Sequence, residues 1–210
     1  MIKLTEAVTF AVDRHKHQVR QVSKIPYAHH VLEVAKMTQQ VYDSLPDYVK
    51  DLLEVNRDEM IIASYFHDLI EDTITPKEEI VTMTNEKVAN LVLEMSRDAD
   101  KEHRQGKYDF LKTFENKSLA SIIIKIADRL ANVRDYMDAG KRKYASKYAL
   151  QAYPLYNAFY KFVNIEGLNY DLGVIGQYIY RLDEIVNYYY PLDMKKSSDI
   201  MIEIVERNVT

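Results

Sequence analysis

Apolar residues recur every three or four positions along most of the chain, and this spacing restricts the fold more than any other feature of the sequence. Such spacing places the apolar side chains on one face of an α-helix. No segment shows the convincing apolar–polar alternation of a half-buried strand. Five glycines and five prolines in 210 residues leave few breaks and no flexible linker. The sequence therefore predicts an all-α protein without internal repeats.

The expected helices can be placed from this periodicity and from capping residues. Residues 75–78, Thr-Pro-Lys-Glu, predict a helix start, with a capping threonine, a proline in the first turn and a glutamate three residues after the cap. Ser118 is expected to cap a long helix that ends near Gly140. The other expected helices cover residues 4–19, 30–42, 58–70, 85–95, 145–162, 174–189 and 198–207.

The composition is that of an ordinary globular protein, with 47% hydrophobic and 29% charged residues. We expect one domain over residues 1–163 and a C-terminal helical extension over residues 164–210 packed on the same domain. No apolar run reaches the roughly eighteen residues of a membrane span. The N-terminus lacks the features of a signal peptide. The absence of cysteine excludes disulfides and thiolate metal sites. Together these features favour a cytoplasmic protein.

The charge distribution disfavours nucleic acid as a partner. The formal net charge is −4, from 28 basic and 32 acidic residues that are well interspersed. The one basic cluster, Lys141, Arg142, Lys143 and Lys147, is too small to follow a nucleic-acid duplex but large enough for a few phosphates. We therefore expect no nucleic-acid partner, and the absence of a membrane span predicts no membrane partner. The C-terminal segment can form the surface of a homo-oligomer or pack back on the bundle.

Four ionisable residues stand close together in the segment SYFHDLIEDT. His67 and Asp68 close an apolar run, and Glu71 and Asp72 follow one helical turn later. Residues four apart share a helix face, so His67 lies beside Glu71 and Asp68 beside Asp72. The segment can be a solvated helix end or a divalent-metal site with its own acid/base pair. A metal site needs further ligands from elsewhere in the chain.

The segment SIIIKIADRLANVRD offers one such ligand. Its apolar residues make a wide buried face, yet Lys125, Asp128, Asn132 and Asp135 form a polar stripe at helical spacing. A carboxylate among such apolar residues is expected to be partly buried and to need a cation or hydrogen-bond donors. Asp128 can therefore be a metal ligand, or it can form a salt bridge with Arg129 or a lysine.

The segment IPYAHHVLEVA offers a histidine. His29 and His30 open an expected helix, and His30 borders the face formed by Val31, Val34 and Ala35. A single histidine near a core is more often hydrogen-bonded than metal-bound, but three other candidate ligands give His30 more weight here.

The motifs YAHH, HDLIED and KIADRLANVRD, taken in this order, resemble the signature of the HD superfamily of metal-dependent phosphohydrolases. More closely they resemble the hydrolase domain of the RelA/SpoT-like alarmone enzymes and the stand-alone small alarmone hydrolases. The resemblance covers residues 7–155 and includes AVDRHKHQVR and SKYALQAYPLY. It implies an HD-domain helical bundle, a fold that agrees with the periodicity. It also implies hydrolysis of (p)ppGpp-like alarmones without a synthetase domain.

Carried over by position, the resemblance implies a metal centre and a catalytic pair. The family ligand comes three residues after the tyrosine of a Pro-Tyr pair, which selects His30. The implied ligands are His30, His67, Asp68 and Asp128. A mixed nitrogen and oxygen set suits Mn²⁺, with Fe²⁺ or Mg²⁺ as less favoured ions. The implied catalytic residues are Glu71 and Asp72, which would position or deprotonate the water and protonate the leaving oxygen.

Substrate contacts are implied at five further positions. Asn132 matches the asparagine of the DRLxN motif, which resembles a nucleoside-contacting position. Arg20 and Ser23 fall in the loop that the family writes as RKSGxPY. Lys143 and Lys147 can hold a diphosphate or form a solvated basic loop.

The loop and its surroundings depart from the family pattern. The loop reads RQVSKIPY here, which is one residue longer and lacks the second basic residue and the glycine. Val31 replaces the usual proline after the ligand histidine. Because these departures lie where the purine would stack, we expect the 3′-diphosphate position to be kept more faithfully than the choice of base.

Two rival functions remain open at this stage. One is an HD-domain nucleotidase or pyrophosphohydrolase that acts on another nucleotide. The other is a non-catalytic nucleotide-binding regulatory module. The intact Glu71-Asp72 pair argues against the second, because a sensor needs a pocket but no proton-transfer groups.

Overall fold

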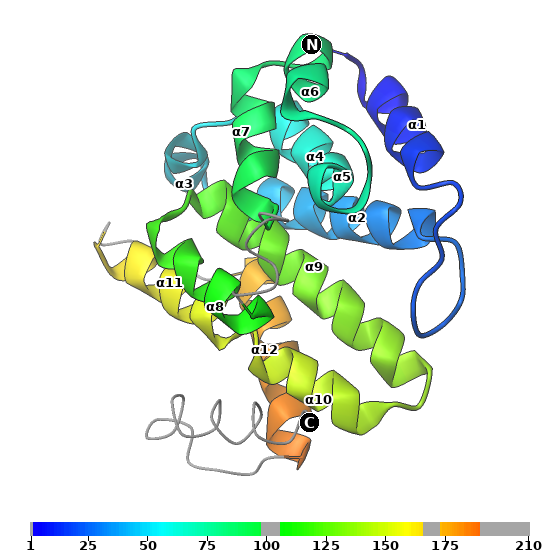
Figure 1. The fold of residues 1–210 in the computed structure, drawn as a ribbon. Helices are drawn as coiled ribbons and strands as arrows, with labels where there is room; N and C mark the ends of the chain where they lie inside the picture. The colour runs from blue at the N-terminus through cyan, green and yellow to red at the C-terminus, as the bar shows by residue number, and fades with distance from the viewer. Residues whose placement is uncertain (1, 98–105, 166–172, 190–210) are drawn as a thin grey trace.

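A computed structural model describes residues 2–97, 106–165 and 173–189, and these residues are largely helical (Figure 1). The only β pairing among them is an isolated antiparallel bridge between Val19 and Pro26. The prediction of an all-α fold is confirmed.

The described residues form these α-helices, with short 3₁₀ turns at Asp51–Leu53 and Thr113–Asn116: α1 (Leu4–Arg14), α2 (Ala28–Ser44), α3 (Asp47–Lys50), α4 (Arg57–Phe66), α5 (Leu69–Asp72), α6 (Lys77–Met83), α7 (Glu86–Met95), α8 (Lys107–Lys112), α9 (Leu119–Asp138), α10 (Arg142–Leu150), α11 (Tyr153–Ile165) and α12 (Gly173–Tyr189).

The long helix α9 organises the molecule. It crosses between a group formed by α1, α2 and α4 to α7 and a second group formed by α8 and α10 to α12 (Figure 1). It packs against α2, α7, α10, α11 and α12. Every residue from Leu119 to Ala131 is buried. The charged side chains of α9 in this stretch therefore need partners inside the protein.

Side-chain caps fix several helix starts. The Asn56 side chain accepts a hydrogen bond from the Glu59 amide, and the Glu59 carboxylate accepts one from the Asn56 amide in return, which makes a capping box at α4. Ser118 caps α9 through the Ser121 amide, as predicted. The predicted threonine cap of α6 is wrong, because the Thr75 hydroxyl bonds Thr73 and the helix begins at Lys77.

Two predicted helices are interrupted. The helix expected over residues 58–70 ends at Phe66, and Asp68 leaves helical geometry with φ −110° and ψ 3° before α5 begins. The helix expected over residues 145–162 is divided into α10 and α11, where Pro154 lies in the first turn of α11 and could not have continued a helix interior. The interruption at Asp68 matters most, because it falls inside the candidate site.

The C-terminal region is described only in part. Helix α12 packs against α10, α9 and α2. The helix expected over residues 198–207 lies outside the described residues. The division at residue 163 falls within α11 and stays a prediction.

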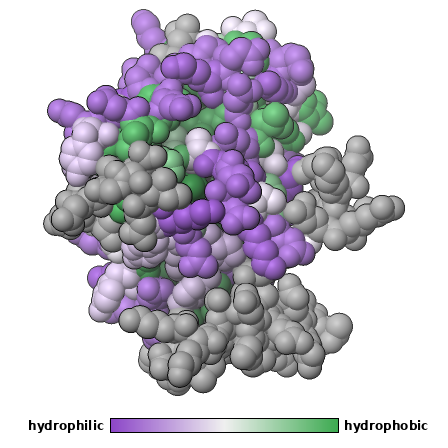
Figure 2. Space-filling view, turned by 90° about the vertical axis from the view of Figure 1, so that its left-hand side faces the viewer, coloured by the Kyte–Doolittle hydropathy of each residue, from purple (hydrophilic) through white to green (hydrophobic). Residues whose placement is uncertain are grey.

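Apolar side chains lie mostly in the core and polar side chains mostly on the surface, as the helical pattern predicts. Apolar side chains of all the long helices join one continuous core cluster. The face shown in Figure 2 is mostly hydrophilic, apart from small apolar patches and the atoms drawn in grey. No described helix has both the length and the apolar character needed to cross a membrane.

Candidate metal centre and active site

Four side chains from three parts of the fold converge at the middle of α9. His30 comes from the first turn of α2, His67 and Asp68 from the junction of α4 and α5, and Asp128 from α9. The Nε2 atoms of His30 and His67 lie 3.3 Å apart. His30 Nε2 lies 3.2 Å from Asp128 Oδ1 and 3.6 Å from Asp68 Oδ2. His67 Nε2 lies 2.8 Å from Asp68 Oδ2 and 3.9 Å from Asp128 Oδ1.

The donor atoms of this cluster suit a metal ion. Ligand atoms of His30, His67 and Asp128 all lie within 4.8 Å of one another, and all three residues are buried. His67 Nδ1 donates to the Ser64 carbonyl at 2.8 Å, so Nε2 is the nitrogen that faces the other ligands. Two imidazole nitrogens and carboxylate oxygens are a common ligand set for divalent metals.

The electrostatics of the cluster also favour a cation at its centre. Burial would lower the pKa of His67, but the carboxylates of Asp68 and Asp128 outweigh burial and raise the pKa of the imidazole. Burial opposes ionisation of Asp68, yet His67 and His30 hold the pKa of that carboxyl well below its usual value. Negative charge concentrated in a dry site stabilises positive charge there.

A buried lysine lies beside the two aspartates and offsets part of their negative charge. Lys125 Nζ lies 3.0 Å from Asp128 Oδ2 and 4.0 Å from Asp68 Oδ1. Burial disfavours its charge, but the two carboxylates keep the pKa of Lys125 above its usual value. The salt bridge considered for Asp128 is therefore formed with Lys125, and it uses the oxygen that points away from the histidines.

Glu71 is fixed by an arginine. Both Oε atoms of Glu71 accept hydrogen bonds from Arg97, from its backbone amide at 3.2 Å and from Nε and Nη2 of its guanidinium at 2.8 and 2.5 Å. Arg97 directly follows the turn at the end of α7, so this ion pair joins α7 to α5. The carboxylate is thereby held in one orientation.

Asp72 has different neighbours. The Tyr27 hydroxyl donates to Asp68 Oδ2 at 2.6 Å and also lies 3.3 Å from Asp72 Oδ2. Gln18 Nε2 donates to the Asp72 carbonyl at 2.6 Å. Loss of solvent around the carboxyl, together with the charges of Asp68 and Glu71, raises the pKa of Asp72 to about 6. Glu71 and Asp72 are therefore adjacent in sequence but lie in different environments.

These groups border a hollow of about 150 Å³. Its lining includes the acidic residues Asp68, Glu71, Asp72 and Asp128. Asn132 lies one turn beyond Asp128, and its Nδ2 donates to Asp128 Oδ1 at 2.6 Å. The remaining lining residues are Tyr27, Arg97, Phe110, Leu111, Lys125, Arg129 and Tyr148.

Arg20 and Ser23 belong to a closed loop that does not line this hollow. Arg20 is buried, and its Nε lies 3.2 Å from Asp135 Oδ2 on α9. The Arg20 amide donates to the Ile25 carbonyl at 2.8 Å, which closes the loop beside the Val19–Pro26 bridge. The half-buried Ser23 has no hydrogen-bond partner for its hydroxyl in the described chain.

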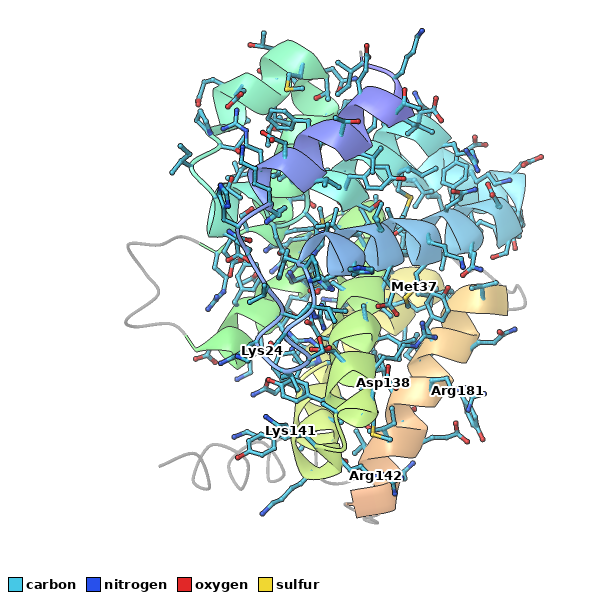
Figure 3. All side chains as sticks on the ribbon, turned by 90° about the vertical axis from the view of Figure 1, so that its right-hand side faces the viewer. Lys24, Met37, Asp138, Lys141, Arg142 and Arg181 are labelled. Carbon is cyan, nitrogen blue, oxygen red and sulfur yellow. The ribbon has the colours of Figure 1, made fainter. Side chains whose placement is uncertain are left out.

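The two lysines predicted to hold a diphosphate, Lys143 and Lys147, do not line this hollow. Lys143 lines a second hollow of about 700 Å³ at the turn between α9 and α10. Lys24, Lys141 and Arg142 line the same hollow, and Figure 3 shows these three from the side of the loop between α1 and α2. Lys147 lines neither of the two hollows. Asn132 therefore lines the same hollow as Asp68 and Asp128, whereas Lys143 and Lys147 do not line it.

Sequence reasoning missed several residues of the hollow. Lys125 was visible as part of the polar stripe, but its pairing with Asp128 required the fold. Tyr27 served only to count positions to His30, although its hydroxyl touches two acidic residues. Arg97 gave no signal, because its partner Glu71 is 26 residues earlier in the chain.

A family profile described as an HD domain matches residues 7–159. The chain belongs to the HD domain family. The matched range includes His30, His67, Asp68 and Asp128 of the candidate metal centre, the pair Glu71 and Asp72, and helix α9.

Comparison with curated and solved proteins agrees with this assignment. The chain is 31% identical over 133 residues to the guanosine-3′,5′-bis(diphosphate) 3′-pyrophosphohydrolase MESH1 of Xenopus tropicalis, covering 63% of this chain and 68% of that protein. It is 30% identical over 159 residues to a protein of the same enzyme name from Aquifex aeolicus, covering 72% of this chain and 20% of that one. These relatives confirm the predicted resemblance to alarmone hydrolases.

A solved structure supports the fold of this HD domain. The structure titled "A metazoan ortholog of SpoT hydrolyzes ppGpp and plays a role in starvation responses" superposes with a TM-score of 0.66 and 22% identity. The match covers 91% of this chain and 98% of the other. The likeness shows that the helical arrangement is shared.

Proposed function

We propose that this HD domain is a metal-dependent phosphohydrolase that removes the 3′-diphosphate of (p)ppGpp-like alarmones as pyrophosphate. The observation that carries the proposal is the convergence of two histidines with Asp68 and Asp128, two aspartates that line the same hollow as the carboxyl groups of Glu71 and Asp72. The names of the MESH1 relatives support the choice of substrate.

The proposed ligands are His30, His67, Asp68 and Asp128, and the proposed ion is Mn²⁺ in preference to Fe²⁺ or Mg²⁺. A divalent ion held there would lower the pKa of a water molecule and polarise a phosphoryl oxygen. The side chains around the ion would carry out the proton transfers.

Glu71 and Asp72 are proposed to divide the proton transfers. Glu71, oriented by its hydrogen bonds from Arg97, accepts a proton from the attacking water. Asp72, whose pKa is raised to about 6, delivers a proton to the ribose 3′-oxygen. The water oxygen bonds to phosphorus, the bond between phosphorus and the 3′-oxygen breaks, and the products are pyrophosphate and a nucleotide with a free 3′-hydroxyl.

The alternative activity is hydrolysis of another nucleotide by the same groups. The altered loop supports it, because Arg20 is buried against Asp135 rather than directed into the hollow. This arrangement favours relaxed base choice, and it leaves the groups that act on phosphorus unchanged.

We expect pyrophosphate from both ppGpp and ppApp in the presence of Mn²⁺, at comparable rates. The reason is that the proposed metal ligands and the pair Glu71 and Asp72 are present, whereas the loop that the resemblance assigns to the base departs from the family pattern. The measurement is chromatographic resolution of products from the two alarmones and the matching 5′-monophosphates. Orthophosphate from the monophosphates, with both alarmones untouched, would replace this proposal by the nucleotidase.

We also expect Mn²⁺ to raise the melting temperature of the protein, because an ion that binds only the folded state shifts the unfolding equilibrium. At a free ion concentration about a hundredfold above Kd, the gain is about 2.7 kcal/mol. Differential scanning calorimetry before and after chelation measures it. A transition that does not move with Mn²⁺, Fe²⁺ or Mg²⁺ contradicts the metal centre.

A further inference from the structure

Arg129 is a buried cation without a carboxylate partner. The buried lysines and arginines in the described part of the chain are Arg20, Lys125 and Arg129. Arg20 pairs with Asp135, and Lys125 pairs with Asp128. Arg129 is 4% exposed, and its Nε and Nη1 atoms are buried without a hydrogen-bond partner. No ion pair joins Arg129 to any described residue.

The guanidinium of Arg129 packs against an aromatic ring. The Arg129 Cζ atom lies 4.3 Å from the centre of the Tyr148 ring. A cation over an aromatic ring is attracted to it, but the ring accepts none of the in-plane N–H hydrogen bonds that a guanidinium can donate. A buried charge with unused donors destabilises the folded protein unless an anion or acceptor reaches it. The fold therefore keeps a costly group at this position.

The position of Arg129 indicates what it could bind. It lines the same hollow as Asp128 and Asn132, so it lies beside the metal cluster. The other cations of that lining are already engaged with acidic residues, Lys125 with Asp128 and Arg97 with Glu71. The contact with the Tyr148 ring gives Nε and Nη1 of Arg129 no hydrogen-bond acceptor, so these N–H groups remain available to one.

We propose that Arg129 binds the phosphate oxygens of the diphosphate group that this site removes. The proposal rests on the proposed function, since it places the leaving diphosphate between the metal cluster and Arg129. A guanidinium is always charged and its planar array of donors matches phosphate oxygens. Arg129 is thus a substrate-binding residue, and Tyr148 supports its side chain from the adjacent helix α10.

The test compares Arg129→Met with Arg134→Met. Arg134 is an exposed arginine on the same helix, paired with Glu33 and away from the hollow, so the control makes the same chemical change. Both variants and the wild type are loaded with the same excess of Mn²⁺ and titrated with methylenediphosphonate by calorimetry. We expect affinity to fall at least about tenfold in Arg129→Met and to stay unchanged in Arg134→Met.

A second readout separates binding from support of the fold. Removing an unpaired buried charge should leave the melting temperature of Arg129→Met at or above that of the wild type. Replacement of a purely structural arginine should lower it by several degrees instead. Arg129→Gln, which also removes the charge, gives the same affinity comparison if the methionine variant does not fold.

The outcomes distinguish this inference from the proposed activity. Unchanged diphosphonate affinity in the Arg129 variants overturns the inference, even if turnover falls. A wild type that binds the diphosphonate through Arg129 but hydrolyses no alarmone upholds the anion site and overturns the 3′-pyrophosphohydrolase. Weakened binding together with a raised KM for ppGpp supports both.

Discussion

Asp128→Ala is expected to lose bound metal and to lower kcat/KM by about a thousandfold or more. The Asp128 carboxylate is buried and contributes one oxygen 3.2 Å from His30 Nε2 and the other to Lys125. Its removal leaves Lys125 as a positive charge beside the centre, which further disfavours a cation there. Metal content by mass spectrometry and turnover of ppGpp measure the two effects.

Two further variants show whether this loss is specific. Asp138→Ala changes an exposed aspartate on the same helix and should keep both metal and turnover. Asp128→Asn preserves the shape of the side chain and an acceptor for Lys125, yet it lacks the charge that a ligand supplies. If purified Asp128→Ala keeps stoichiometric Mn²⁺, the assignment of Asp128 as a ligand is wrong.

Glu71→Gln is expected to lower kcat about a hundredfold or more while metal content and KM stay near the wild-type values. Glutamine keeps the shape of the side chain and an oxygen that Arg97 can still donate to. It cannot accept a proton from water, so the loss falls on the chemical step. Steady-state kinetics with ppGpp and metal analysis of the same preparation separate the two roles.

The matched control is Glu78→Gln, which changes an exposed glutamate in the first turn of α6 and should leave kcat unaltered. Unchanged turnover in Glu71→Gln would return Glu71 to the interpretation as a helix end, fixed by Arg97 for stability alone. A loss of metal in this variant would instead make Glu71 part of the metal centre.

The helices could be predicted from sequence because their stability comes from apolar faces with a regular period. The start of α9 at Ser118 follows from a local cap, and so does the start of α7 at Asn85. The break after Phe66 could not be predicted, because the apolar pattern continues through it. The first helix also ends at Arg14, five residues early, since the following residues leave the helix to form the loop that carries Arg20.

The candidate site was likewise predictable only in part. The motifs name His30, His67, Asp68 and Asp128, and the fold brings these four together. What the sequence could not supply is the pairing between distant elements. The packing of helices from different parts of the chain decides which carboxylate pairs with which cation. The same packing leaves Arg129 without a carboxylate partner.

The loop around Arg20 has a consequence for the speed and entropy of ligand binding. Its ends are joined by the Val19–Pro26 bridge, Tyr27 donates its amide to the Gln18 carbonyl at 3.0 Å, and Arg20 anchors it to Asp135. A loop already held in this way loses little conformational entropy when a ligand meets it. Gln21, Val22 and Lys24 of this loop line the second hollow, so a ligand that enters that hollow meets a surface that does not have to become ordered first.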